Sequence, residues 1–97
     1  MAYIIQRGQR DAAKRLGVLI VPSKDPDKKI AVFRNGVLVA QIGQRGYMDY
    51  FLYLKAEKAG KFPKGYAAKR RKLYKLRHKN NRHKFGTAGF YADQILW

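Results

Sequence analysis

Residues 29–42 have the sequence KIAVFRNGVLVAQI, and this stretch decides the fold. Two apolar runs, 29–33 and 37–42, flank the pair Asn35-Gly36. Asn-Gly is the preferred central pair of a type I′ turn, because both central residues of that turn need positive φ angles. The stretch therefore predicts a β-hairpin.

The segments before the hairpin predict another strand and a short helix. Residues 18–21 are a compact apolar run ended by Pro22, and we expect them to pair with the hairpin in a three-stranded antiparallel sheet. An apolar arm at residues 1–7 would supply a fourth strand if it joins this sheet. Residues 9–16 fit two helical turns, and Gly17 is well placed as the residue that closes them.

The segments after the hairpin predict helices. Asp49 is a candidate N-cap for a helix at residues 50–59, and Thr87 is a candidate N-cap for a short helix at 88–97. Between them, residues 66–83 predict a basic helix of about 27 Å, at about 1.5 Å per residue. The expected fold class is α+β: a small antiparallel β-hairpin sheet followed by two or three helices, the central one strongly basic.

Length and composition limit the kind of protein. Ninety-seven residues predict a single small domain, with a β-rich half at 1–42 and a basic helical half at 43–97. The 22 lysines and arginines against 6 acidic residues give a net charge of +16, which favours an anionic partner. The absence of cysteine excludes disulfides and thiolate metal sites. With no apolar run near 18 residues and no signal-peptide pattern, we expect a soluble protein that is intracellular where it is made.

The predicted basic helix has two different faces. At 3.6 residues per turn, one half carries apolar side chains and the other carries basic ones. The apolar half holds Tyr66, Ala67, Leu73, Tyr74 and Leu76, and the basic half holds Arg71, Lys72, Lys75, His78, Lys79, Arg82 and His83. No acidic residue occurs between Lys61 and Phe90, so a local network of ion pairs cannot form. The basic half is therefore expected to meet an anion; a solvated charged face is the alternative.

Polyanion binding is the chemistry that this region favours. Residues 55–84 contain 13 lysines and arginines and the single acid Glu57, which is enough for several phosphate contacts and a steep salt dependence. The candidate residues are Lys69, Arg70, Arg71, Lys72, Lys75, Arg77, His78, Lys79, Arg82, His83 and Lys84. Tyr66, Tyr74 and Phe85 lie among them, either to stack on unpaired bases or to belong to the core.

Catalysis has little support in the sequence. The six acidic residues show no paired-carboxylate spacing. His78 and His83 are five positions apart, about 140° around a helix, so they cannot bind one metal ion from a regular helix. The glycines at 43 and 46 lack the Lys-Ser/Thr pair of a phosphate-binding loop. We therefore expect no enzyme activity, no cofactor, no metal and no small-molecule substrate.

The second half of the chain contains four short motifs in a fixed order. They are Gly-Tyr-Met-Asp-Tyr at 46–50, Arg-His-Lys at 77–79, Gly-Thr-Ala-Gly-Phe at 86–90 and Ile-Leu-Trp at 95–97. In this order they resemble a family of small basic proteins, without an assigned activity, encoded by nucleocytoplasmic large DNA viruses and some algal genomes. The resemblance covers residues 43–97, and it carries over no catalytic or binding residue.

The resemblance implies a minor capsid-type structural protein of the virion, made in the host cytoplasm or nucleus. Its partners would be major capsid or other virion proteins, and its basic helix would contact acidic protein, genome or a membrane surface without insertion. The residues expected to contact protein form the aromatic C-terminus: Phe90, Tyr91, Ile95, Leu96 and Trp97. The alternative is a sequence-tolerant nucleic-acid-binding protein, which condenses DNA or binds RNA as a ribosomal-type subunit does.

Overall fold

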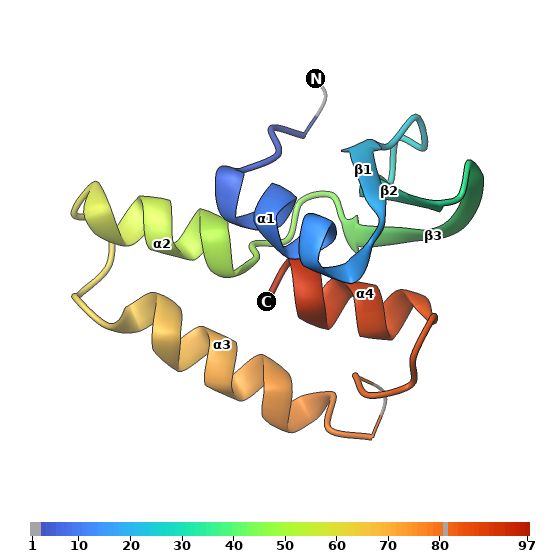
Figure 1. Cartoon of the computed structure of the whole chain (residues 1–97). Coiled ribbons are helices and arrows are strands. Elements are labelled where there is room, and N and C mark those ends of the chain that lie inside the picture. Colours follow the sequence, from blue (N-terminus) through green and yellow to red (C-terminus); the bar gives the residue numbers. More distant parts are fainter. Residues whose placement is uncertain (1–2, 81) are drawn as a thin grey trace.

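A three-stranded sheet and four helices make up the described part of the chain, which is residues 3–80 and 82–97 of a computed structural model (Figure 1). In chain order the elements are α1 (Arg7–Leu16), β1 (Leu19–Pro22), β2 (Lys28–Arg34), β3 (Val37–Gln44), α2 (Tyr50–Lys58), α3 (Tyr66–Arg77) and α4 (Ala88–Ile95). The predicted α+β class is confirmed, with three helices after the sheet and a basic helix, α3, at their centre. Figure 1 shows α4 against α1 and β3, with α2 and α3 side by side.

The sheet forms as the sequence predicts. Its order is β1-β2-β3, and both pairs are antiparallel. Asn35 and Gly36 connect β2 to β3 with φ angles of 51° and 79°, the left-handed conformation that a type I′ turn needs. Residues 3–6 form no strand, so no fourth strand is present in the described residues; the start of the predicted arm, residues 1–2, lies outside them.

The core lies between one face of the sheet and two helices, α1 and α4. Side chains alternate along a strand, so each strand gives one set of residues to the core and the other to the opposite face. The core set is Ile20, Ile30, Val32, Ala40 and Ile42 from the sheet, Ala12 and Ala13 from α1, and Tyr91, Ile95 and Leu96 at the C-terminus. On the opposite face Leu19, Val21 and Val39 are exposed. The helices therefore cover only one face of the sheet.

The predicted helix caps are confirmed. The Asp49 carboxylate accepts a hydrogen bond of 2.9 Å from the Leu52 N–H, and the Thr87 hydroxyl accepts one of 3.2 Å from the Phe90 N–H. Gly17 closes α1 with a φ of 72°. Each cap satisfies backbone groups that a helix end leaves unpaired. The bounds of α1, α2 and α4 differ from those predicted by one to two residues, the usual uncertainty at a fraying end.

A buried polar network joins the N-terminal arm to the rest of the fold. The Lys29 ammonium lies 3.1 Å from the Asp49 carboxylate and also donates to the Tyr47 carbonyl. The Tyr3 hydroxyl donates to the same carboxylate at 2.7 Å, and the Gln9 amide donates to Tyr3 at 2.8 Å. Burial raises the pKa of the Tyr3 hydroxyl, which keeps this group a proton donor. The network thus holds the arm, α1, β2 and α2 together.

The basic helix is shorter than predicted. Its 12 residues end at Arg77, with His78 at the cap, so α3 is about 18 Å long rather than 27 Å. Residues 78–80 and 82–83 form turns instead of helix. Asn80 favours turns over helix, and consecutive like charges oppose further helical turns. The prediction that the helix continues to residue 83 was therefore wrong.

The predicted apolar half of this helix was wrong for its two leucines only. Leu73 and Leu76 are 38% and 63% exposed, so neither packs in the core, whereas Ala67 is buried as predicted. Tyr66, Arg70, Tyr74 and His78 are half-buried, and each lies four positions after the previous one. Residues four apart lie on one side of a helix, and this side meets aromatic rings of α2 and of the C-terminus.

Candidate polyanion-binding surface

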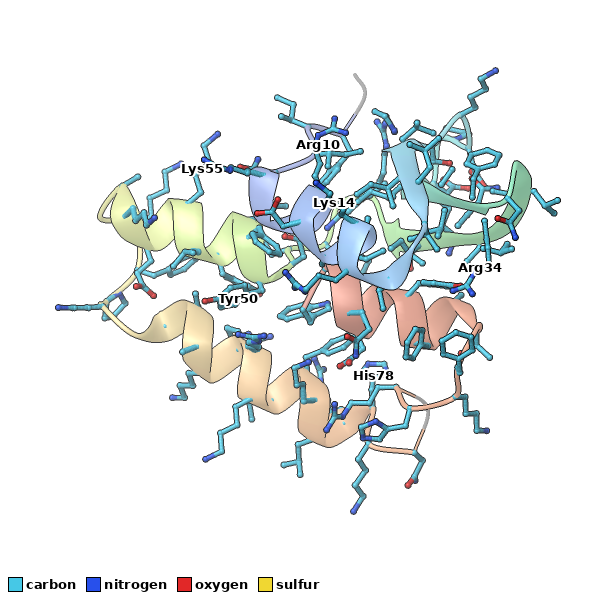
Figure 2. All side chains as sticks on the ribbon, viewed as in Figure 1. Arg10, Lys14, Arg34, Tyr50, Lys55 and His78 are labelled. Atoms are coloured by element: carbon cyan, nitrogen blue, oxygen red, sulfur yellow. The ribbon has the colours of Figure 1, made fainter. Side chains whose placement is uncertain are left out.

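The predicted polyanion-binding residues divide into an exposed group and a half-buried group. The exposed group is Lys69, Arg71, Lys72, Arg77, Lys79, His83 and Lys84, which we call the α3 cation surface. The half-buried group is Arg70, Lys75, His78 and Arg82. Figure 2 shows long side chains projecting from α3 on the side away from α2 and α4. Most of the predicted residues are therefore accessible to solvent.

Lys75 and Arg82 are tied to α4. The side chain of Asp93 is fully buried, and its carboxylate lies 2.9 Å from the Lys75 ammonium and 3.6 Å from the Arg82 guanidinium. Gln94 also donates to this carboxylate, at 3.0 Å. These two cations hold the end of α3 and the turn after it against α4. Their charge is offset inside the protein, so we do not count them in the α3 cation surface.

Asp93→Asn is expected to lower the free energy of unfolding by about 1.5–3 kcal/mol, the usual range for a hydrogen bond to a charged group. The loss is not larger, because the side chains of Lys75 and Arg82 are partly exposed and can rotate toward the solvent. Urea denaturation followed by circular dichroism measures it. Asp11→Asn is the matched control, since it makes the same charge change at an exposed residue of α1. Equal losses in both variants would show that only net charge matters.

Aromatic rings support two arginines of α3. The Arg71 guanidinium lies 4.7 Å from the ring centre of Tyr50, and that of Arg70 lies 5.5 Å from the ring centre of Tyr53. In Figure 2 Tyr50 lies between α2 and α3. A cation over an aromatic face contributes about 0.5–1 kcal/mol at an exposed site. Tyr50 therefore fixes the position of Arg71 while leaving this arginine exposed.

Two of the aromatic residues predicted to lie among the charges are half-buried and stacked on other rings. Tyr66 stacks on Phe62 at 4.4 Å, and Tyr74 stacks on Trp97 at 4.4 Å with only 7° between the rings. Burial, with the nearby Asp93 carboxylate, raises the pKa of the Tyr74 hydroxyl. Phe85 is exposed and contacts Phe90. Of the three candidates for stacking on bases, only Phe85 remains accessible.

Three of the residues predicted to contact a protein partner lie in the core. Tyr91, Ile95 and Leu96 are buried against the sheet and α1, because α4 turns one side toward the sheet. They are not available to a partner in this structure, so that part of the prediction is corrected. Phe90 and Trp97 are half-buried at the edge of the same core.

The N-terminus of α3 is capped by a residue of α2. Gly65, at the N-cap position, offers no side chain, and the Glu57 carboxylate accepts a hydrogen bond of 2.9 Å from the Ala67 N–H. The N–H groups of Ala67 and Gly65 lower the pKa of Glu57. The sequence analysis did not predict this contact. Glu57 is the single acid among 13 cations in residues 55–84, and this isolation was a signal that its side chain has a structural role.

The described residues contain no group of three or more His, Asp or Glu side chains that could hold a metal ion. In the same part of the chain no helix has the length and apolar character needed to cross a membrane. The feature that stands out is thus an accessible cationic surface.

Comparison with known proteins gives no relative: no family model, curated protein or solved structure matches this chain.

Proposed function

We propose that the protein is a non-enzymatic structural component of a viral particle, and that it binds nucleic acid through the α3 cation surface. The observation that carries the proposal is the set of lysines on this surface, whose charges meet no acidic residue between positions 61 and 90. The viral setting comes from the resemblance of residues 43–97 to small basic proteins of large DNA viruses. Major capsid or other virion proteins would be its neighbours there.

The geometry of α3 suits contact with phosphates. The helix is about 18 Å long, which is roughly the length of five base pairs. Lysine and arginine contacts to phosphates position a protein without reading sequence, so the proposed binding is sequence-tolerant. Several such contacts release counterions, and the affinity should therefore fall steeply with salt.

Changing Lys69, Lys72, Lys79 and Lys84 to Gln is expected to weaken binding to a duplex of about 20 base pairs, a length of about 68 Å that exceeds α3. The slope of log affinity against log salt concentration should become shallower by about 2–4, since each lost phosphate contact removes about 0.9. Fluorescence anisotropy at several salt concentrations measures this slope. These lysines make no ion pair in the described structure, so the fold should be retained.

The matched control changes Arg7, Arg10, Lys14 and Arg15 of α1, which lie on another element, to Gln. It removes the same charge and should change the slope by less than half as much. Equal effects of the two variants would show that binding depends on total charge and not on α3. An affinity that stays flat from low to physiological salt would rule out phosphate contacts altogether.

The viral role has its own test. Native particles should contain this chain at a fixed ratio to the major capsid protein, as measured by quantitative mass spectrometry. If the chain is absent from particles but binds the duplex with a steep salt dependence, the structural role is wrong. The protein is then a free nucleic-acid-binding protein.

A further inference from the structure

A pocket of about 500 Å³ lies on the inner side of α3, and Arg77 is the residue of the α3 cation surface that lines it. The loop after β3, α2, α3 and the C-terminus meet there. Its volume falls within the range of about 300–1,000 Å³ that is common for small-ligand sites. Arg70, Arg77 and His78 line it from α3, and Tyr47 and Trp97 line it from the other elements.

The pocket is lined by three cationic side chains, Lys29, Arg70 and Arg77, and by one acid. The Nε of Arg70 is buried and has no hydrogen-bond partner, and Arg77 makes no ion pair in the described structure. The acid in its lining, Asp49, already accepts from Lys29, Tyr3 and the Leu52 N–H. An anion in the pocket would offset the positive charges of the Arg70 and Arg77 guanidinium groups.

The pocket also offers an aromatic ring that is free to stack. Tyr47 is 68% exposed and makes no ring contact with another described residue. Trp97 is already covered on one face by Tyr74, which in turn stacks on His78 at 4.2 Å. In Figure 2 His78 lies between the end of α3 and α4. Cationic donors and a free ring in one cavity match a ligand that has both a phosphate and a flat base.

We propose that this pocket binds one nucleoside monophosphate group, with its phosphate on Arg70 and Arg77 and its base against Tyr47. The group is either a free nucleotide or an unpaired residue of a nucleic-acid strand. Binding of an unpaired residue of a strand extends the proposed function and rests on it, because the outer face of α3 would then hold the backbone of the same strand. The pocket and the outer face use different side chains, apart from Arg77.

The chain carries its own reporter for this pocket. Trp97 is the single tryptophan of the sequence, and it lines the cavity. Titration with adenosine monophosphate at constant ionic strength should change its fluorescence in a saturable way. Inorganic phosphate alone and adenosine alone should each bind at least tenfold more weakly. Titration with a short oligo(dA) single strand separates the two sources: tighter binding than by the free nucleotide assigns the pocket to a strand.

Arg77→Gln and Tyr47→Ala are the test variants, since both side chains are exposed and their loss should not disturb folding. Each should weaken adenosine monophosphate binding at least tenfold. Lys72→Gln is the control for Arg77→Gln, because it removes one charge from the outer face of the same helix, and it should change the affinity less than twofold.

Three results would overturn the proposal: no change in Trp97 fluorescence up to millimolar nucleotide, binding of phosphate as tight as that of the nucleotide, or equal losses in Arg77→Gln and Lys72→Gln. Failure of the proposed function is a separate result. If wild-type protein binds the mononucleotide but not the duplex, nucleotide binding by the pocket is supported and duplex binding by the outer face of α3 is wrong. The variant with four lysines changed to Gln should keep its mononucleotide binding.

Discussion

Asp49→Asn is expected to lower the free energy of unfolding by about 3–5 kcal/mol, because it leaves a charged Lys29 buried without its partner. The two side chains are only 5% and 1% exposed, so neither can reach water without opening the fold. Asparagine is itself a favoured N-cap, so the cap on α2 is kept and the change isolates the charge. Urea denaturation followed by Trp97 fluorescence and by circular dichroism gives the free energy.

The double variant Lys29→Met with Asp49→Asn tests the cause. It removes the unpaired charge and should recover most of the loss, as replacement of whole buried ion pairs usually does. If Asp49→Asn alone does not fold, the double variant still can be measured. A double variant as unstable as the single one would show that the network acts through packing and not through charge.

Gly43→Ala is expected to lower the free energy of unfolding by about 2–5 kcal/mol through two separate effects. The φ of Gly43 is +75°, and a side chain in that left-handed region costs about 1–2 kcal/mol. The new Cβ would also lie 2.8 Å from a methyl carbon of Leu96 and 2.9 Å from the Lys29 side chain. Overfilling a packed site costs about 1–3 kcal/mol more. Denaturation curves measure the sum.

Gly46→Ala separates these two effects. Gly46 has a φ of +90°, but its Cβ would meet nothing within 4 Å. It should therefore show only the backbone cost of about 1–2 kcal/mol. If the two variants lose equal stability, the close approach of Leu96 and Lys29 to Gly43 does not contribute to the loss in the free energy of unfolding.

The parts of the fold that the sequence predicts well depend on chemistry within a few residues. The type I′ turn needs only Asn35 and Gly36, and the caps of α2 and α4 need one side chain each, Asp49 and Thr87. Such signals do not depend on what lies across the molecule. The end of α3 and the side of α3 that faces inward do depend on the rest of the molecule; the end was predicted wrongly, and so were Leu73 and Leu76 on the inward side.

A prediction from hydrophobicity alone placed two leucines of α3 on its inward side, where they do not lie. Leu73 and Leu76 were expected to pack, but the available surface consists of aromatic rings such as Tyr53 and Trp97. Flat groups such as Arg70 and Tyr74 stack on these rings better than leucines do. The side of a helix that turns inward therefore follows the chemistry of its neighbours as much as its own pattern.

The charge of the candidate site could be read from the sequence, but its pairing could not. All the predicted cations lie on or just after α3, and most of them are exposed. Lys75 and Arg82 differ because Asp93 lies beyond the acid-free stretch and reaches them only once α4 has packed. The pocket behind α3 was not predicted either, because it is lined by segments far apart in the chain.

The two acids that hold α3 belong to its neighbours, Glu57 to α2 and Asp93 to α4. An isolated 12-residue helix is marginal in water, and like charges along it reduce its stability further. α3 thus gains little by forming before both neighbours are present. Since α4 follows α3 in the chain, we expect α3 to become stable only after the C-terminal residues have been synthesised and α4 has packed. Two carboxylates outside α3 thus decide when this helix becomes stable.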